Sequence, residues 1–245
     1  MREFWVWGAP QSIGIEIGVD LLVPIDVDEL VKDVSAGTDY TLSILEDGSA
    51  IVDGYINDPE DYQGHFACGC ESLGLETGVN SKTISSVVDL DDTVIDAPEW
   101  EKVFAGVESS PGSGQMHSLL IDVDGNVYAS GNNNKGQLCL GDDEPRIFAT
   151  QIDLPDGEKA VSAVVGGEHT LILTESGKIY GCGSNQLGQL GLGDTLETDR
   201  PEEVEGLSSV KSISGGRNFA TIKTKEGMYV MGNNVELTML FAWLP

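Results

Sequence analysis

Apolar and polar residues alternate along several short stretches of this chain, and each stretch ends at a turn. From His169 onwards, Leu171 and Leu173 share a face with His169, whereas Ile172 falls on the other face. A period of two residues is that of a β-strand. Gly177 then marks a tight turn, because glycine readily adopts the positive φ that hairpin turns require. The pattern predicts a β-hairpin, and no segment shows the sustained periodicity of a helix.

The same hairpin occurs four times in one frame, in which a ring-bearing residue is followed by a turn glycine and then by a closing glycine. The ring-bearing residues are Tyr40, His117, His169 and Phe219, the turn glycines are Gly48, Gly125, Gly177 and Gly227, and the closing glycines are Gly54, Gly131, Gly183 and Gly232. Repeats of about 50 residues form stacked units, because one unit cannot bury its own apolar face. We predict an all-β fold made of antiparallel β-propeller blades, an incomplete propeller of about four repeats.

The residues after two of the closing glycines indicate the type of propeller. Residues 131–138 read Gly-Asn-Asn-Asn-Lys-Gly-Gln-Leu, and residues 183–194 contain the same Gly-Gln-Leu element. These segments resemble the signature of the regulator of chromosome condensation repeat family. The resemblance covers Val103 to Asn234 well and residues 1–102 loosely. Kelch propellers share the period but lack this element, and Trp-Asp propellers have a shorter period and a dipeptide that is absent here.

Chain length predicts an arc rather than a closed ring. Seven blades, the number that the resemblance implies, would need roughly 350 residues at about 50 per blade, whereas this chain has 245. We expect a propeller segment over residues 1–234, a non-repeat tail over residues 235–245, and a truncated or mis-spliced gene product. A smaller ring and assembly with a second chain are the alternatives.

The charge of the chain narrows the classes of partner. Its 41 acidic and 13 basic residues give a formal net charge of −28, so we expect no direct contact with nucleic acid and no docking on anionic membranes. A basic protein surface is the natural complement, although an acidic surface also promotes solubility without any partner. The N-terminus lacks the pattern of a secretory signal, so we expect an intracellular protein, cytoplasmic or nuclear and not secreted.

Several residues suggest chemistry at first sight. His65, Cys68 and Cys70 offer soft metal ligands at close spacing, but a structural zinc site needs a fourth ligand. The segment 122–126, Asp-Val-Asp-Gly-Asn, resembles part of a calcium loop, but it aligns with the hairpin turns of the other repeats. His117 and His169 occupy a position that Tyr40 and Phe219 fill elsewhere, so we interpret them as buried packing or hydrogen-bonding residues. We therefore expect no catalytic residue, no metal site and no cofactor.

The four cysteines do not form the framework of a disulfide-rich domain, which agrees with a reducing compartment. We interpret Cys139 and Cys182 as small residues of the core.

The longest interval between closing glycines, from Gly54 to Gly131, is the best candidate for a binding surface. It spans 77 residues, and the excess is expected as loops outside the sheet, where binding residues often lie. Negative charge and aromatic groups occur together in this interval. The candidate partner-binding residues are Tyr55, Tyr62, Phe66, Asp89, Asp91 and Asp92.

Two functions remain open at this point. The first is a non-catalytic protein–protein interaction module, since the resemblance implies propellers that dock other proteins. The second is guanine-nucleotide exchange on a Ran-type small GTPase, the activity of the founding member of the family. A shared fold does not decide between them.

Overall fold

The computed structural model describes residues 4–6, 23–25, 31–37, 40–54, 69–72, 80–107, 116–207 and 209–233. These residues form an all-β array of twisted sheets, with one short 3₁₀ helix at Pro155–Gly157. None of the described residues belongs to a helix that is long and apolar enough to cross a membrane. The expected tail at residues 235–245 lies outside the described part of the chain.

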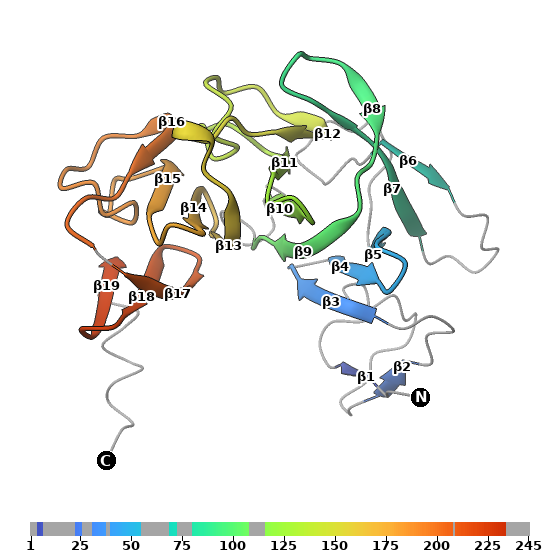
Figure 1. The fold of residues 1–245 in the computed structure, drawn as a ribbon, viewed down its shortest axis with the longest axis horizontal. Helices are drawn as coiled ribbons and strands as arrows, with labels where there is room; N and C mark the ends of the chain where they lie inside the picture. The colour runs from blue at the N-terminus through green and yellow to red at the C-terminus, as the bar shows by residue number, and fades with distance from the viewer. Residues whose placement is uncertain are drawn as a thin grey trace.

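The sheets form four blades arranged along an arc (Figure 1). Blade 1 contains β3 (Val31–Ala36), β4 (Tyr40–Leu45), β5 (Ala50–Gly54) and β7 (Asn80–Val88), and β6 (Gly69–Ser72) and β8 (Val94–Asp96) also pair with β7. Blade 2 contains β9 (Trp100–Ala105), β10 (His117–Asp122), β11 (Val127–Gly131) and β12 (Arg146–Gln151). Blade 3 contains β13 (Ala160–Val165), β14 (His169–Thr174), β15 (Ile179–Gly183) and β16 (Thr198–Glu203). Blade 4 contains β17 (Val210–Gly216), β18 (Phe219–Thr224) and β19 (Met228–Gly232), while β1 (Phe4–Val6) and β2 (Val23–Ile25) form a separate ribbon.

The strand register confirms the repeat frame that the sequence predicts. In every blade the ring-bearing residue lies opposite the closing glycine: Tyr40 pairs with Gly54, His117 with Gly131, His169 with Gly183 and Phe219 with Gly232. Glycine is required at this place. At Gly183, φ is +101° and an added Cβ would fall 2.4 Å from the carbonyl oxygen of Glu168. Any other residue would therefore meet both backbone strain and a clash with the main chain.

The hairpin turns follow the prediction in three blades and depart from it in the fourth. Gly48, Gly125 and Gly177 have φ values of +84°, +77° and +83°. Gly227 is not among the glycines with positive φ. The hydroxyl of Thr224 accepts hydrogen bonds from the amides of Glu226 and Gly227 instead. The last repeat is one residue shorter, and a side-chain hydrogen bond holds its turn.

Apolar clusters fill the space between successive blades. The alternation along β10 directs Leu120 into the cluster shared with blade 1, and Leu119 into the cluster shared with blade 3. In β14, Leu171 and Leu173 pack toward blade 4, whereas Ile172 packs toward blade 2. Each fully buried leucine or isoleucine stabilises the stack by about 1.5–3 kcal/mol. The face assignments made from the sequence are therefore confirmed.

Blades 1 and 2 are joined by hydrogen bonds between strands, in addition to the packing of their side chains. The outer strand β7 runs parallel to β12, with Val87 opposite Ala149 and Val88 opposite Thr150. The excess residues of the long interval were expected to form loops outside the sheet, but part of the excess forms β6 and β8, which pair with β7. The expectation was therefore wrong for these two segments, because each of them adds to the outer edge of blade 1.

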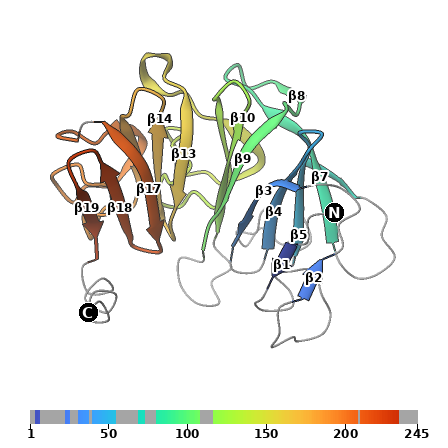
Figure 2. The same ribbon diagram turned by 60° about the horizontal axis from the view of Figure 1, so that its bottom comes forward.

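Blades 1 and 4 lie at the two ends of the arc (Figures 1 and 2). In blade 3 the outer strand β16 pairs with β15, and Tyr180 is only 2% exposed. Among the described residues no strand pairs with the outer edge of β19, and Tyr229 and Val230 are 42% and 38% exposed. The fourth blade therefore presents a partly apolar edge strand to solvent.

Candidate interaction site

The hairpin that joins β7 and β8 projects from the outer edge of blade 1. At its tip, the Oδ1 atom of Asp89 accepts hydrogen bonds from the amides of Asp91 and Thr93, at 3.0 and 2.9 Å. Asp92 adopts the left-handed region, with φ at +56°, which aspartate tolerates better than most residues. The carboxylate of Asp89 thus holds the turn. Those of Asp91 and Asp92 make no hydrogen bond or ion pair within the part of the chain that the structure describes, and both residues are exposed.

Apolar side chains stand beside these acids on the same hairpin. Leu90 is 53% exposed, Val94 58% and Ile95 39%. Sequence reasoning missed them because it sought aromatic anchors. The available signal was the mixture of four aspartates with one leucine, one valine and one isoleucine over residues 89–96. A surface with both apolar side chains and unpaired charge is typical of a contact site.

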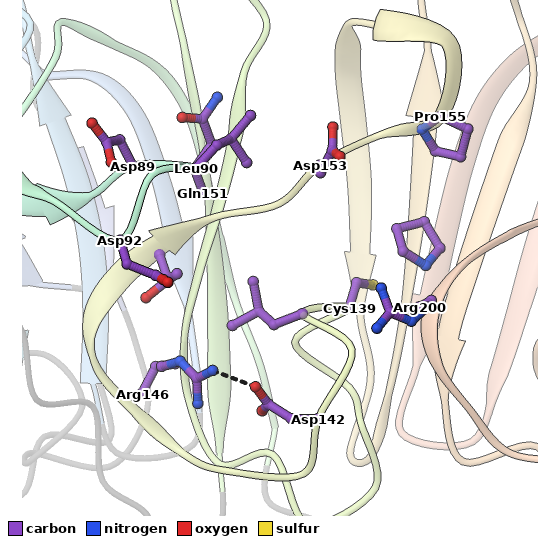
Figure 3. Close-up of a pocket in the computed structure, with 13 residues that line it drawn as sticks. Asp89, Leu90, Asp92, Cys139, Asp142, Arg146, Gln151, Asp153, Pro155 and Arg200 are labelled. Carbon is purple, nitrogen blue, oxygen red and sulfur yellow. Dashed lines mark hydrogen bonds and ion pairs between the residues drawn. The ribbon is translucent and has the colours of Figure 1, made fainter.

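A cavity of about 560 Å³ lies next to the hairpin tip. Its wall includes Asp89, Leu90 and Asp92 from the hairpin, and Cys139, Leu140, Asp142, Arg146, Asp153 and Arg200 from blades 2 and 3. Figure 3 shows these groups around the open space, with Arg146 paired to Asp142. We name the hairpin residues 89–95 together with this cavity the hairpin site.

Three of the predicted partner-binding residues cannot be placed relative to the hairpin site. Tyr55, Tyr62 and Phe66 lie outside the described residues, so their place in a binding surface stays a prediction. Trp100 also lies in the long interval, at the start of β9. It is completely buried and contacts Tyr128 edge to face, with 5.3 Å between ring centroids.

The ring-bearing residues join neighbouring blades. The Tyr40 hydroxyl is hydrogen-bonded to the hydroxyl of Ser118 in blade 2, and Nε2 of His117 lies 2.9 Å from Oγ1 of Thr170 in blade 3. In the next interface Ala220 stands at the position of Ser118 and Thr170. Accordingly, neither ring nitrogen of His169 has a hydrogen-bond partner among the residues that the structure describes.

Both described histidines are unsuited to proton transfer with a substrate. Burial lowers the pKa of His117 to about 3, with a further contribution from nearby His169. Burial also lowers the pKa of His169 to about 4. Each side chain is at most 1% exposed. The interpretation of both residues as part of the core is thus confirmed.

The acidic segment at residues 122–126 is a hairpin turn. Oδ1 of Asp122 accepts hydrogen bonds from the amides of Asp124 and Asn126, at 3.0 and 2.8 Å. This carboxylate therefore stabilises its own turn. The described residues contain no group of three or more side chains arranged to hold a metal ion. His65 and Cys68 fall outside these residues, and the side chain of Cys70 is not described.

Cys139 and Cys182 lie in the core, as predicted, but they are also joined by a disulfide. The sequence interpretation of two separate small side chains was therefore incomplete. Nothing in the spacing of 43 residues indicates the pairing, because only the stacking of blade 2 on blade 3 brings the loop after β11 close to β15.

Comparison with family models identifies the repeats. The regulator of chromosome condensation (RCC1) repeat matches residues 124–173 and 176–222, and a second model of the same repeat matches residues 159–189. These ranges contain blade 3 and parts of blades 2 and 4, including the Gly-Gln-Leu element from which the resemblance was drawn.

Known proteins are similar to parts of this chain. The human X-linked retinitis pigmentosa GTPase regulator is 35% identical over 127 residues, which cover 50% of this chain and 12% of that protein. A Xenopus laevis RCC2 homolog is 47% identical over 124 residues, covering 49% of this chain and 24% of that protein. The Arabidopsis thaliana ultraviolet-B receptor UVR8 is 27% identical over 215 residues, covering 86% of this chain and 43% of the receptor. The chain thus spans less than half the length of each relative.

Solved structures support the fold. Yeast RCC1 (Prp20), bound to Kap60, superposes with a TM-score of 0.70 at 17% identity, over 95% of this chain and 52% of that one. Human WBSCR16 gives a TM-score of 0.67 at 20% identity, over 93% of this chain and 56% of that one. Sequence and structure agree: this chain carries regulator of chromosome condensation repeats, and its blades have the β-propeller fold of RCC1.

Proposed function

We propose that this chain is a non-catalytic protein–protein interaction module that docks a partner at the hairpin site. The observation that carries the proposal is the juxtaposition of exposed Leu90, Val94 and Ile95 with the unpaired carboxylates of Asp91 and Asp92, beside a cavity. Apolar side chains supply binding energy when a partner covers them, and the acids favour a partner with basic groups. The cytoplasmic or nuclear setting expected from the sequence is part of this proposal.

The known proteins are consistent with docking as the mode of action. Prp20 was crystallised in complex with Kap60, and another of its structures is described together with its binding to Gsp1p and histones. Relatives in this repeat family include a regulator and a receptor. In addition, the described histidines are buried, and burial lowers both pKa values. These facts favour binding over group-transfer chemistry.

Affinity capture with a matched pair of variants tests the proposal. The hairpin variant carries Leu90→Ser, Asp91→Asn and Asp92→Asn. The control carries Leu196→Ser, Glu175→Gln and Glu226→Gln, which remove one exposed leucine and two exposed acids from blades 3 and 4. Proteins retained by the wild type and the control but lost from the hairpin variant would support the proposal. Equal retention by all three proteins would refute it.

Nucleotide exchange is separated from docking by a direct assay. We expect release of a fluorescent guanine nucleotide from a Ran-type GTPase to proceed at its intrinsic rate when this chain is added in catalytic amount. A large acceleration would show that exchange, the alternative left open by the sequence, is the function.

A further inference from the structure

The disulfide between Cys139 and Cys182 crosses from one blade to the next. Cys139 lies in the loop after β11, next to Leu138 of the Gly-Gln-Leu element, and Cys182 lies on β15. Their Cα atoms are 5.5 Å apart, which is within the usual range for a disulfide. The bond therefore ties a loop of blade 2 to a strand of blade 3.

The next interface makes the same contact without a covalent bond. Gly191 occupies the place of Cys139 and Met231 the place of Cys182, and a Cβ built on Gly191 would meet the sulfur of Met231. Around this contact, apolar residues of blades 3 and 4 pack against each other, and no disulfide is formed at this position. Blade stacking in this protein thus does not require a disulfide at the position.

The backbone conformation at Cys139 is a second, independent sign that cysteine has a particular role at this position. Its φ is +59°, close to the +70° of Gly191. This left-handed conformation suits glycine and disfavours residues that carry a Cβ. Backbone preference alone would favour glycine at position 139. A cysteine there provides what glycine cannot, a sulfur that reaches the neighbouring blade.

We propose that Cys139 and Cys182 form a redox-responsive staple that locks the loop of blade 2 against blade 3. The two cysteines differ in their relation to the cavity. Cys139 is part of the cavity wall, together with Arg200 (Figure 3), and is 3% exposed, whereas Cys182 is not among the lining residues and is 0% exposed. The proposal therefore places the attack of a small thiol at Cys139, from the cavity. Disulfides in reducing compartments are usually transient or redox-sensing.

The reaction is thiol–disulfide exchange with a small dithiol or with two monothiols. A thiolate attacks Sγ of Cys139, the bond between the cysteine sulfurs breaks, and Cys182 leaves as a thiolate that takes up a proton. A second thiolate attacks the reductant's sulfur in this mixed disulfide. Cys139 then leaves as a thiolate that takes up a proton, and the reductant is released as a disulfide. The carbonyl oxygen of Gln137 lies 3.4 Å from Sγ of Cys182 and accepts a hydrogen bond from the new thiol.

The staple also bears on the hairpin site, and this step rests on the proposed function. Cys139, Leu140 and Asp142 all lie on the cavity wall. Reduction removes the covalent restraint on this loop, so the wall facing Leu90 gains freedom to rearrange. Partner affinity would then depend on the redox state.

Peptide mapping and melting test the staple without any partner. The 245-residue chain is equilibrated with oxidised glutathione, alkylated and digested. We expect a cross-linked peptide pair containing Cys139 and Cys182. Reduction with dithiothreitol should lower the melting temperature by roughly 5–10 °C. The variant Cys139→Gly, which copies Gly191, should show no such shift. Free thiols at both positions after oxidation, or an equal shift in this variant, would overturn the proposal.

Single-cysteine reactivity tests the route of attack and does not depend on the melting experiment. Cys182→Ser leaves Cys139 as a free thiol on the cavity wall, and Cys139→Gly leaves Cys182 buried. We expect a small aromatic disulfide reagent to modify Cys139 in the first variant at least tenfold faster than Cys182 in the second. Equal rates would refute access from the cavity. Circular dichroism confirms that each variant keeps its strand content. If the wild-type chain captured no partner in either redox state, that result would count against the hairpin site and not against the staple.

Discussion

At the scale of single residues, the ring-bearing position links one blade to the next. Tyr40 and His117 each find a hydroxyl in the following blade, on Ser118 and Thr170. In the blade after His169 the equivalent position is Ala220, which has no hydroxyl, and His169 has no hydrogen-bond partner within the described part of the chain. A buried polar group without a partner costs about 1–3 kcal/mol. The sequence predicted burial from the interchange of tyrosine, histidine and phenylalanine, but not the missing partner, which depends on a residue one blade away.

The buried histidines predict that stability falls in mild acid. Both pKa values are lowered in the folded state, to about 3 for His117 and about 4 for His169, from the ordinary value of 6.5. Between pH 6.5 and pH 4 the two histidines are therefore protonated in the unfolded chain but neutral in the folded chain. As a result, the free energy of unfolding decreases as pH falls. We expect a loss of about 1 kcal/mol per histidine between pH 7.5 and pH 5.5, measured by urea denaturation.

A phenylalanine at position 169 provides the control for this pH effect. Phe219 fills the same place in blade 4, with its ring over Gly216 as His169 lies over Gly166. His169→Phe should therefore fold and should lose less stability over the same pH range. An identical pH dependence in the two proteins would contradict the assignment of the effect to His169.

The closing glycines predict a second residue-scale result. Gly183→Val should destabilise the protein by about 3 kcal/mol or more, because its Cβ would clash with the Glu168 carbonyl at a positive φ. Asp194→Ala should cost only about 1 kcal/mol, since it removes an exposed carboxylate that accepts hydrogen bonds from the Asn185 side chain and the Leu196 amide. Thermal melts of both variants measure the difference. Similar melting temperatures would show that the repeat frame is misplaced.

At the scale of elements, the hairpin of β7 and β8 combines structural and free acids. Asp89 accepts two amides within its turn, whereas Asp91 and Asp92 make no such contact in the described structure. The sequence predicted an acidic contact surface here, but it treated the three aspartates alike. The hydrogen-bond pattern that distinguishes them depends on the turn between two strands that the sequence had assigned to a loop.

The division of roles among the aspartates predicts a kinetic effect. Asp91→Asn with Asp92→Asn should slow partner association by roughly 2- to 10-fold at low salt and leave dissociation nearly unchanged, because unpaired charges steer encounter. The difference should disappear at high ionic strength. Surface plasmon resonance with the captured partner measures both rates. A changed dissociation rate with an unchanged association rate would assign these acids a different role.

At the scale of the whole molecule, the repeat frame gave the fold and left the connections between blades undetermined. Glycine spacing placed the hairpins, and alternation assigned Leu171 and Ile172 to their faces. The parallel pairing of β7 with β12 and the disulfide between Cys139 and Cys182 could not be predicted. The strand pairing and the disulfide both depend on how the blades stack in space. This stacking joins residues that are far apart in the sequence, and no local sequence pattern indicates it.

The exposed edge of blade 4 predicts self-association of the isolated 245-residue chain. Met228, Tyr229 and Val230 on β19 are 69%, 42% and 38% exposed, and an unpaired edge strand of this kind binds another strand. Sedimentation velocity should show dimers or larger species that increase with concentration. Val230→Lys should reduce them, because a charged residue protects an edge. A monodisperse monomer with a melting temperature independent of concentration would refute this prediction.

The docking claim is tested most directly by site-specific photo-crosslinking. A benzophenone amino acid is placed at Val94 in the hairpin site or at Leu196 in blade 3, two exposed positions that are 58% and 71% accessible. Cross-linked products from lysate are identified by mass spectrometry at low and high salt. We expect a discrete partner that is cross-linked to position 94 at low salt, less strongly at high salt, and not to position 196. A partner linked only from position 196, or equally from both, would contradict docking at the hairpin site.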